Sequence, residues 1–245
     1  MNLTQMLVIA VAFVIAGVAK GALGMGMPPI AIGLMTFVLP LQDAIVFMVA
    51  PTIVTNIWQA VYGGGFVRLM RRFGTMTVTA IAGVLAVAAW GHVGAEGATA
   101  WVGVVLVLYA LIALTAWRPK VPRGAEVWAN PVIGFASGAM AGITGVAAVP
   151  FLPYMQSLDI DRHDLVQGLG ILFLFMIGAI TAGLAWQGGF QIANSVGGLL
   201  AVAPTMVGVW LGQILRRRLS PEMFRRVFLL SLLAIGLHMA HTLIF

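Results

Sequence analysis

The sequence predicts an all-α polytopic membrane protein made of two inverted-topology repeats, each with a broken, re-entrant hairpin followed by three transmembrane helices. Three observations support this prediction: the composition, an internal repeat of glycine-rich breaks, and the distribution of basic residues. Of the 245 residues, 61% are hydrophobic and only 8% are charged, whereas a soluble domain carries about 25% charged residues. Apolar runs of roughly 20 residues, enough to cross about 30 Å of hydrocarbon, recur along the chain.

Full-length and broken apolar segments alternate in the same order in both halves. The N-terminal repeat, 1–120, is expected to contain the broken segment 3–39 and helices at 43–62, 74–93 and 98–117. The C-terminal repeat, 121–245, is expected to contain the broken segment 130–157 and helices at 165–186, 192–214 and 221–244. No soluble domain or long linker separates them, so we expect one membrane domain.

The repeat is visible in two related motifs, "GVAKGALGMGMPP" from Gly17 and "GAMAGITGVAAVP" from Gly138. A single shift in numbering superposes Gly17 on Gly138, Gly21 on Gly142, Gly24 on Gly145, Pro29 on Pro150 and Asp43 on Asp164. Glycine and proline both interrupt helices, proline because it lacks a backbone donor. The break itself is therefore the repeated feature. The two aspartates are expected to cap the helices that follow them.

The basic residues give an orientation. Lysine and arginine gather in 67–73, 118–124 and 215–226, and such loops are expected to be cytoplasmic. An even number of crossings must then separate the second and third of these loops, and two full helices already supply two. The segment 130–157 is too short for two further crossings, which need about 40 residues. We therefore expect a re-entrant hairpin of two half-helices, with paired crossings as the alternative.

The same count places the ends of helices 43–62 and 165–186 on opposite sides of the membrane. The halves would then form an inverted repeat, an arrangement typical of secondary transporters, which bind substrate where the broken segments meet.

The two glycine motifs, each followed by a polar-capped helix, resemble the TauE/SafE family of sulfite exporters over nearly the whole chain. The resemblance implies a multi-pass carrier of the bacterial cell inner membrane that moves sulfite or an organosulfonate, usually outward. Together with the inverted repeat, it leads us to expect export by alternating access. It leaves the exact substrate, the coupling ion and the direction of transport open. The alternatives are an anion channel or a carrier of a different small anion. An enzyme is not expected, because the chain has no HExxH motif, GxSxG motif or paired acids.

Lys20 is the only lysine or arginine inside an apolar segment, and it lies in the first break. An intramembrane charge costs at least about 2.5 kcal/mol on insertion scales, which favours a functional role. Helix N-termini near the break would add unpaired N–H groups, and these also favour an anion. We expect Lys20 to contact the substrate; the alternative is that its side chain snorkels to the membrane interface.

Other polar and glycine positions complete the expected site. Four polar residues of helix 43–62 share one face, either as a wall of the site or as interhelical hydrogen bonds worth about 0.6 kcal/mol each. Gly24 and Gly26 are expected to form the first break, whereas Gly17 and Gly21 have close helix packing as the alternative. The expected substrate-binding residues are Lys20, Gly21, Gly24, Gly26, Thr52, Thr55, Asn56, Gln59, Gly142, Thr144 and Gly145.

No cofactor and no metal site are expected, since the chain has no cysteine and its histidines lie apart from carboxylates at helix ends and loops. The expected partners are a small anionic substrate and the lipid bilayer, and a homodimer is left open. The net charge of +6 does not indicate nucleic-acid binding, because the cations lie in short loops between apolar runs.

Overall fold

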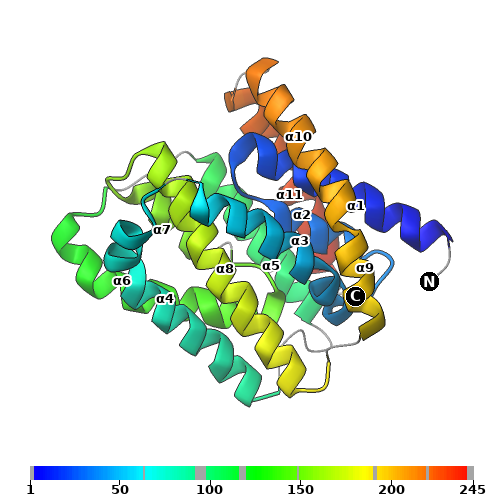
Figure 1. Ribbon diagram of the computed structural model, residues 1–245, viewed down its shortest axis with the longest axis horizontal. Coiled ribbons are helices and arrows are strands. Elements are labelled where there is room, and N and C mark those ends of the chain that lie inside the picture. The colour runs from blue at the N-terminus through cyan, green and yellow to red at the C-terminus, as the bar shows by residue number, and fades with distance from the viewer. Residues whose placement is uncertain are drawn as a thin grey trace.

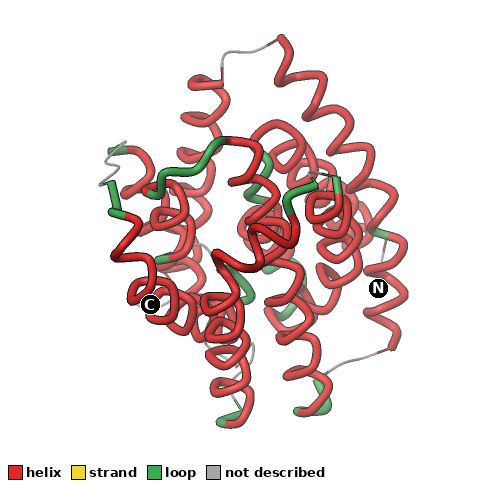
Figure 2. The backbone as a smooth tube through the Cα atoms, turned by 60° about the vertical axis from the view of Figure 1, so that its left-hand side comes forward, coloured by secondary structure: helices red, strands yellow, loops and turns green. Residues whose placement is uncertain are grey.

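A computed structural model describes residues 3–62, 64–91, 98–115, 120–147, 149–189, 192–218 and 221–241. This part of the chain is helical throughout and contains no strand (Figure 2). Its helices are α1 (Leu3–Leu23), α2 (Met27–Met35), α3 (Leu41–Val61), α4 (Phe66–Ala89), α5 (Ala98–Leu114), α6 (Arg123–Thr144), α7 (Phe151–Ser157), α8 (Arg162–Trp186), α9 (Ile192–Leu200), α10 (Val202–Arg218) and α11 (Pro221–His241).

Among the described residues, five helical segments are long and apolar enough to cross a membrane. They are Thr4–Leu23, Leu41–Val61, Phe66–Ala89, Arg162–Trp186 and Ser195–Leu215. The shorter apolar helix α5 has 17 residues. The prediction of an all-helical, multi-pass membrane protein is therefore confirmed.

Three predicted boundaries are wrong. The second broken segment, predicted from 130, already begins as helix α6 at Arg123. Helix α4 begins at Phe66 rather than 74, so the expected loop 67–73 forms its first two turns, because Gly64 and Gly65 already complete the turn after α3. The predicted helix 192–214 is interrupted at Ala201 and continues as α10 to Arg218. Pro204 lies in the first turn of α10, where a missing backbone donor costs no hydrogen bond.

Both broken segments fold back on themselves as hairpins. In the first, Gln5 Nε2 donates a hydrogen bond to the Val38 carbonyl, at 3.3 Å. In the second, the Val121 N–H donates to the Ser157 carbonyl, at 3.1 Å. The start and end of each segment are thus adjacent. Paired crossings are disfavoured because the second helices, α2 and α7, have only 9 and 7 residues, too few to cross a membrane.

The limbs of each hairpin are unequal, so the expectation of two half-helices is wrong. The first limbs, α1 and α6, have 21 and 22 residues, whereas the second limbs, α2 and α7, have 9 and 7. The first limbs are long because the early glycines of each motif remain helical, and the helix ends only at the third glycine.

The third glycine of each motif ends its helix in the same way. Gly24 has φ 80° and Gly145 has φ 72°, a left-handed conformation that L side chains rarely adopt. Their N–H groups donate to the carbonyls of Lys20 and Ala141, both at 2.7 Å, as in a glycine C-cap. The repeat seen in the sequence is therefore also a repeat of local backbone structure.

The earlier glycines bring helices into backbone contact. Helix α1 packs along α10, as Figure 1 shows in blue and orange, and α6 packs along α4. A Cβ atom on Gly21 would overlap the Val209 carbonyl of α10, and one on Gly138 would overlap the Ala80 carbonyl of α4. Gly21 therefore has the packing role that the sequence left as the alternative.

Helices α3 and α8 lie side by side and antiparallel. Near one end, Gln167 Nε2 of α8 donates to the Ala60 carbonyl at the end of α3, at 2.7 Å. Beyond the other end of α8, a Cβ on Gly189 would overlap the amide of Gln42 at the start of α3. The start of each helix thus lies beside the end of the other.

We predict that Gly21→Ala destabilises the protein, because the added methyl group meets the α10 backbone, which cannot move aside. Overpacking of this kind costs about 1–3 kcal/mol, which a thermal unfolding scan of the purified protein would detect. Gly178→Ala in α8 is the matched control, since a Cβ there meets nothing within 4 Å. Equal unfolding temperatures for the two variants would contradict the packing role of Gly21.

Candidate functional site

The structure places Lys20 in the last turn of α1, one turn before the break, with its side chain directed at α3. Only 6% of the residue is exposed, and its Nζ donates a short hydrogen bond to Asn56 Oδ1. Asn56 is fully buried, with 0% exposed. The lysine therefore does not snorkel to the molecular surface; it lies inside the helix bundle against a neutral acceptor.

The polar face of α3 presents several unsatisfied groups beside this pair. Among the described residues, Thr52 Oγ1, Asn56 Nδ2 and Gln59 Oε1 are buried and have no hydrogen-bond partner. Buried polar atoms are nearly always paired, so three unpaired atoms on one helix face are unusual. Thr55 differs, because its hydroxyl donates to the Pro51 carbonyl of its own helix, at 2.8 Å.

Gln59 links this face to the first break. Its Nε2 donates to the Gly24 carbonyl, at 2.8 Å, which satisfies a backbone acceptor that the end of α1 leaves free. The break is tightly enclosed: a Cβ on Gly24 would meet Val166 of α8 and one on Gly26 would meet Phe228 of α11. These contacts form one connected group. Together with Thr52, we call it the α1–α3 polar cluster: Lys20, Gly24, Thr52, Asn56 and Gln59.

The expected residues of the second break lie elsewhere. A Cβ on Gly145 would meet Ile32 of α2 and Ile45 of α3, at 2.8 and 2.7 Å. Ile45 is separated from Gln59 by 14 positions of α3, or about 20 Å along the helix at 1.5 Å per residue. The two breaks therefore contact different parts of α3.

The remaining two residues of the second break have structural roles in this conformation. Thr144 Oγ1 donates to the Met140 carbonyl, at 2.7 Å, and accepts from the Val146 N–H, at 3.1 Å. Gly142 provides room for Val87 of α4. The structure therefore brings together the expected site residues of the first half and of α3, and does not add Gly142, Thr144 and Gly145 to them.

Sequence reasoning missed a network of polar contacts at one end of the bundle. Arg72 of α4 pairs with the buried Glu126 of α6 through two hydrogen bonds, Nε to Oε2 at 2.8 Å and Nη2 to Oε1 at 2.6 Å. Asn130 donates to the Arg72 carbonyl and accepts from the Tyr154 hydroxyl, at 3.1 and 2.6 Å. The sequence feature that could have predicted this network is the pair Glu126 and Asn130, one helical turn apart at the start of α6, together with the arginine-rich segment 67–73.

A second pair closes the same end of the bundle between α4 and α8. Arg68 Nη2 lies 2.7 Å from Asp164 Oδ1, and the Gly65 N–H donates to Gln167 Oε1, at 3.1 Å. Arg68 is largely exposed, so this ion pair contributes about 1 kcal/mol or less. The ion pairs Arg68–Asp164 and Arg72–Glu126 nevertheless lie at the same end of the helix bundle.

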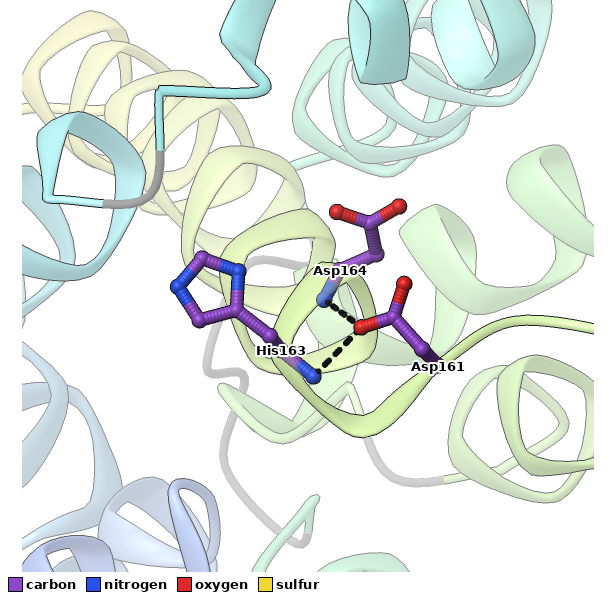
Figure 3. A group of neighbouring side chains, drawn as sticks. All are labelled: Asp161, His163 and Asp164. Atoms are coloured by element: carbon purple, nitrogen blue, oxygen red, sulfur yellow. Dashed lines mark hydrogen bonds between the residues drawn. The ribbon is translucent and has the colours of Figure 1, made fainter.

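The start of α8 differs from the prediction. Asp161, not Asp164, is the N-cap: its Oδ1 accepts from the N–H groups of His163 and Asp164, both at 2.9 Å (Figure 3). Carboxylate and imidazole atoms of these three residues lie within 4.8 Å of one another, so the expectation that the histidines lie apart from carboxylates is wrong at His163. Their hydrogen bonds are those of a capped helix N-terminus, and Asp164 is engaged by Arg68.

An all-helical bundle with membrane-length helices defines the class: a multi-pass membrane protein. The chain belongs to the family described as sulfite exporter TauE/SafE, whose sequence model matches residues 9–239. This is a family of membrane transporters and not of enzymes. No curated protein and no solved structure matches the chain.

We predict that the cap at Asp161 makes stability depend on pH. The N–H groups of Asp164 and His163 hold the pKa of Asp161 below its ordinary value of 3.8, so its stabilising effect is present above pH 3.8 and is lost as the pH falls through the lowered value. Asp161→Asn keeps a capping oxygen without the charge. The unfolding temperature of the native protein should exceed that of Asp161→Asn at neutral pH, and the difference should vanish in acid.

A difference in unfolding temperature between the two proteins that stays constant from neutral to acidic pH would contradict that prediction.

Proposed function

We propose that this protein is a secondary transporter that exports a small sulfur-containing anion, sulfite or an organosulfonate, across the bacterial cell inner membrane by alternating access. The observation that carries the proposal is the buried Lys20 side chain, whose hydrogen-bond partner among the described residues is the neutral Asn56 amide. A buried cation without a carboxylate partner is costly, and an anionic ligand would supply the missing charge. Family membership supports sulfur-containing anions as the class of ligand.

Binding would exchange one acceptor for another. In this conformation Lys20 Nζ donates to Asn56 Oδ1; an arriving anion would take over that donor. The unsatisfied Asn56 Nδ2 and the Thr52 hydroxyl lie on the same face of α3 and would donate to further oxygens of the anion. Hydrogen bonds to a charged group contribute about 1.5–3 kcal/mol each, enough to offset the loss of the anion's hydration only when several act together.

Alternating access is supported by how the two halves are related. Helices α3 and α8 follow equivalent breaks and pack antiparallel, with Gln167 beside Ala60. Each break also lies against the short limb of the other hairpin: Met25 Sδ accepts from Gln156 Nε2 of α7, at 3.8 Å, and Gly145 lies against Ile32 of α2. Two inverted halves in this arrangement could exchange conformations, so that the cluster faces each side in turn.

We propose that the end carrying the arginine pairs is cytoplasmic. Arg68, Arg72 and Arg123 all form ion pairs there, with Asp164, Glu126 and Asp159. The Arg225 side chain donates to the Ala113 carbonyl near the same basic segments. An excess of Lys and Arg marks the cytoplasmic side, and the large exposed side chains along the helices would face lipid.

Removing the Lys20 charge should strongly reduce export. We expect Lys20→Met to reduce saturable sulfite exchange in proteoliposomes at least about tenfold, because one charge-assisted hydrogen bond is lost. Lys120→Met is the matched control, since Lys120 is the only other lysine in the chain and is exposed outside the helices. Unchanged exchange in Lys20→Met, or a non-saturating voltage-driven current in the native protein, would overturn the proposal.

The opposite orientation of α3 and α8 can be tested without background labelling, because the chain contains no cysteine. Tyr62 and Trp186, at the ends of these helices, are almost equally exposed, at 73% and 72%. A membrane-impermeant maleimide should label Trp186→Cys in intact cells and label Tyr62→Cys only after permeabilisation. Labelling of both, or of neither, in intact cells would contradict inverted halves.

A further inference from the structure

We propose that Gln59 selects sulfonates that carry a hydrogen-bond donor, a hydroxyl or an ammonium group, two carbons from the sulfonate. This inference rests on the proposed function, because it assigns the sulfonate end to Lys20 and Asn56. It concerns a different atom, Gln59 Oε1, which an oxyanion alone cannot satisfy.

The orientation of the Gln59 amide fixes what this residue offers. Its Nε2 donates to the Gly24 carbonyl, so the amide cannot be reversed without placing two carbonyl oxygens together. Oε1 therefore remains an acceptor, buried and without a partner among the described residues. The Asn56 amide is fixed likewise, because Oδ1 accepts from Lys20 and Nδ2 remains a free donor.

The two unsatisfied atoms are complementary in kind and lie on neighbouring residues of one helix face. Asn56 and Gln59 are three positions apart, so their side chains leave α3 about 5–6 Å from each other. Asn56 Nδ2 and Gln59 Oε1 do not bond each other in the structure. A ligand that satisfies both atoms would accept from the first and donate to the second.

A fully ionised oxyanion meets only half of this requirement. Its oxygens accept from Lys20 and Asn56, but an anionic oxygen beside Gln59 Oε1 would be repelled and would leave that atom unsatisfied. Leaving a buried acceptor unsatisfied lowers the affinity by about 10- to 100-fold. A donor at the other end of a short sulfonate removes this cost, and a two-carbon chain covers about one helical turn.

The test compares two ligands of the same charge and nearly the same shape. Isethionate has a hydroxyl where n-propanesulfonate has a methyl group, and both are monoanions at neutral pH. Isothermal titration of the purified full-length protein should show isethionate binding about tenfold more tightly than n-propanesulfonate. In Gln59→Met, which has no side-chain acceptor of this kind, the ratio should fall to about one.

Gln187→Met is the matched control. The Gln187 amide also donates to a backbone carbonyl, that of Ala88 at 2.9 Å, but at the opposite end of α8 from Gln167. This variant should keep the native ratio. The comparison of isethionate with n-propanesulfonate in the native protein requires no substitution. It therefore tests whether the protein prefers a ligand with a donor even if Gln59→Met does not fold.

The outcomes separate this inference from the proposed function. Equal affinity for the two ligands in the native protein, with binding lost in Lys20→Met, would overturn selection by Gln59 and leave the transporter proposal standing. Binding of sulfite but of neither sulfonate would have the same meaning. Binding of none of the three anions would overturn both proposals.

Discussion

Both halves of this protein depend on one constraint: a helix that ends inside a membrane bundle leaves carbonyl groups that the protein itself must satisfy. At each break a glycine in the left-handed conformation closes the helix with a bond to the carbonyl four residues back. This allows α1 and α6 to reverse direction in three to six residues and to return as α2 and α7. The adjacent ends of each hairpin, and the order of helices after it, follow from this reversal.

The two breaks differ in how their remaining polar groups are satisfied. The second is self-contained, because Thr144 bonds the backbone on both sides of it. The first is completed from another helix, through the Gln59 amide of α3. That dependence draws α3 against the end of α1 and brings Asn56 beside Lys20. Ala141 occupies the position equivalent to Lys20 in the second motif, so the shared architecture carries a polar cluster in one half only.

The two ends of the bundle are held together by different interactions. At the basic end, Arg72 and Glu126 join α4 to α6, and Gln167 joins α8 to α3. Around the second break the contacts are apolar, with Ile32 and Ile45 against Gly145. Apolar side chains can slide past one another at little cost. Separating an ion pair leaves both charges unpaired until water reaches them, so the pairs hold one geometry. The polar cluster lies nearer the end that is closed by charges.

The sequence by itself determined the class, the repeat and the identity of the buried cation. Composition, glycine spacing and a lone lysine are local properties, and each has a direct physical cost in a membrane. It also placed the polar stripe of α3 on one helix face. Only the tertiary structure decided which of these features meet. Spacing along a helix cannot show that Gly21 lies on the α10 backbone, that Thr55 is used within its own helix, or that the two breaks contact α3 at points about 20 Å apart along its axis. It could not show that Asp161 caps α8 either, because capping depends on where the first turn begins. Those facts depend on packing between segments far apart in the sequence, where shape and the need to satisfy every buried polar atom select one arrangement.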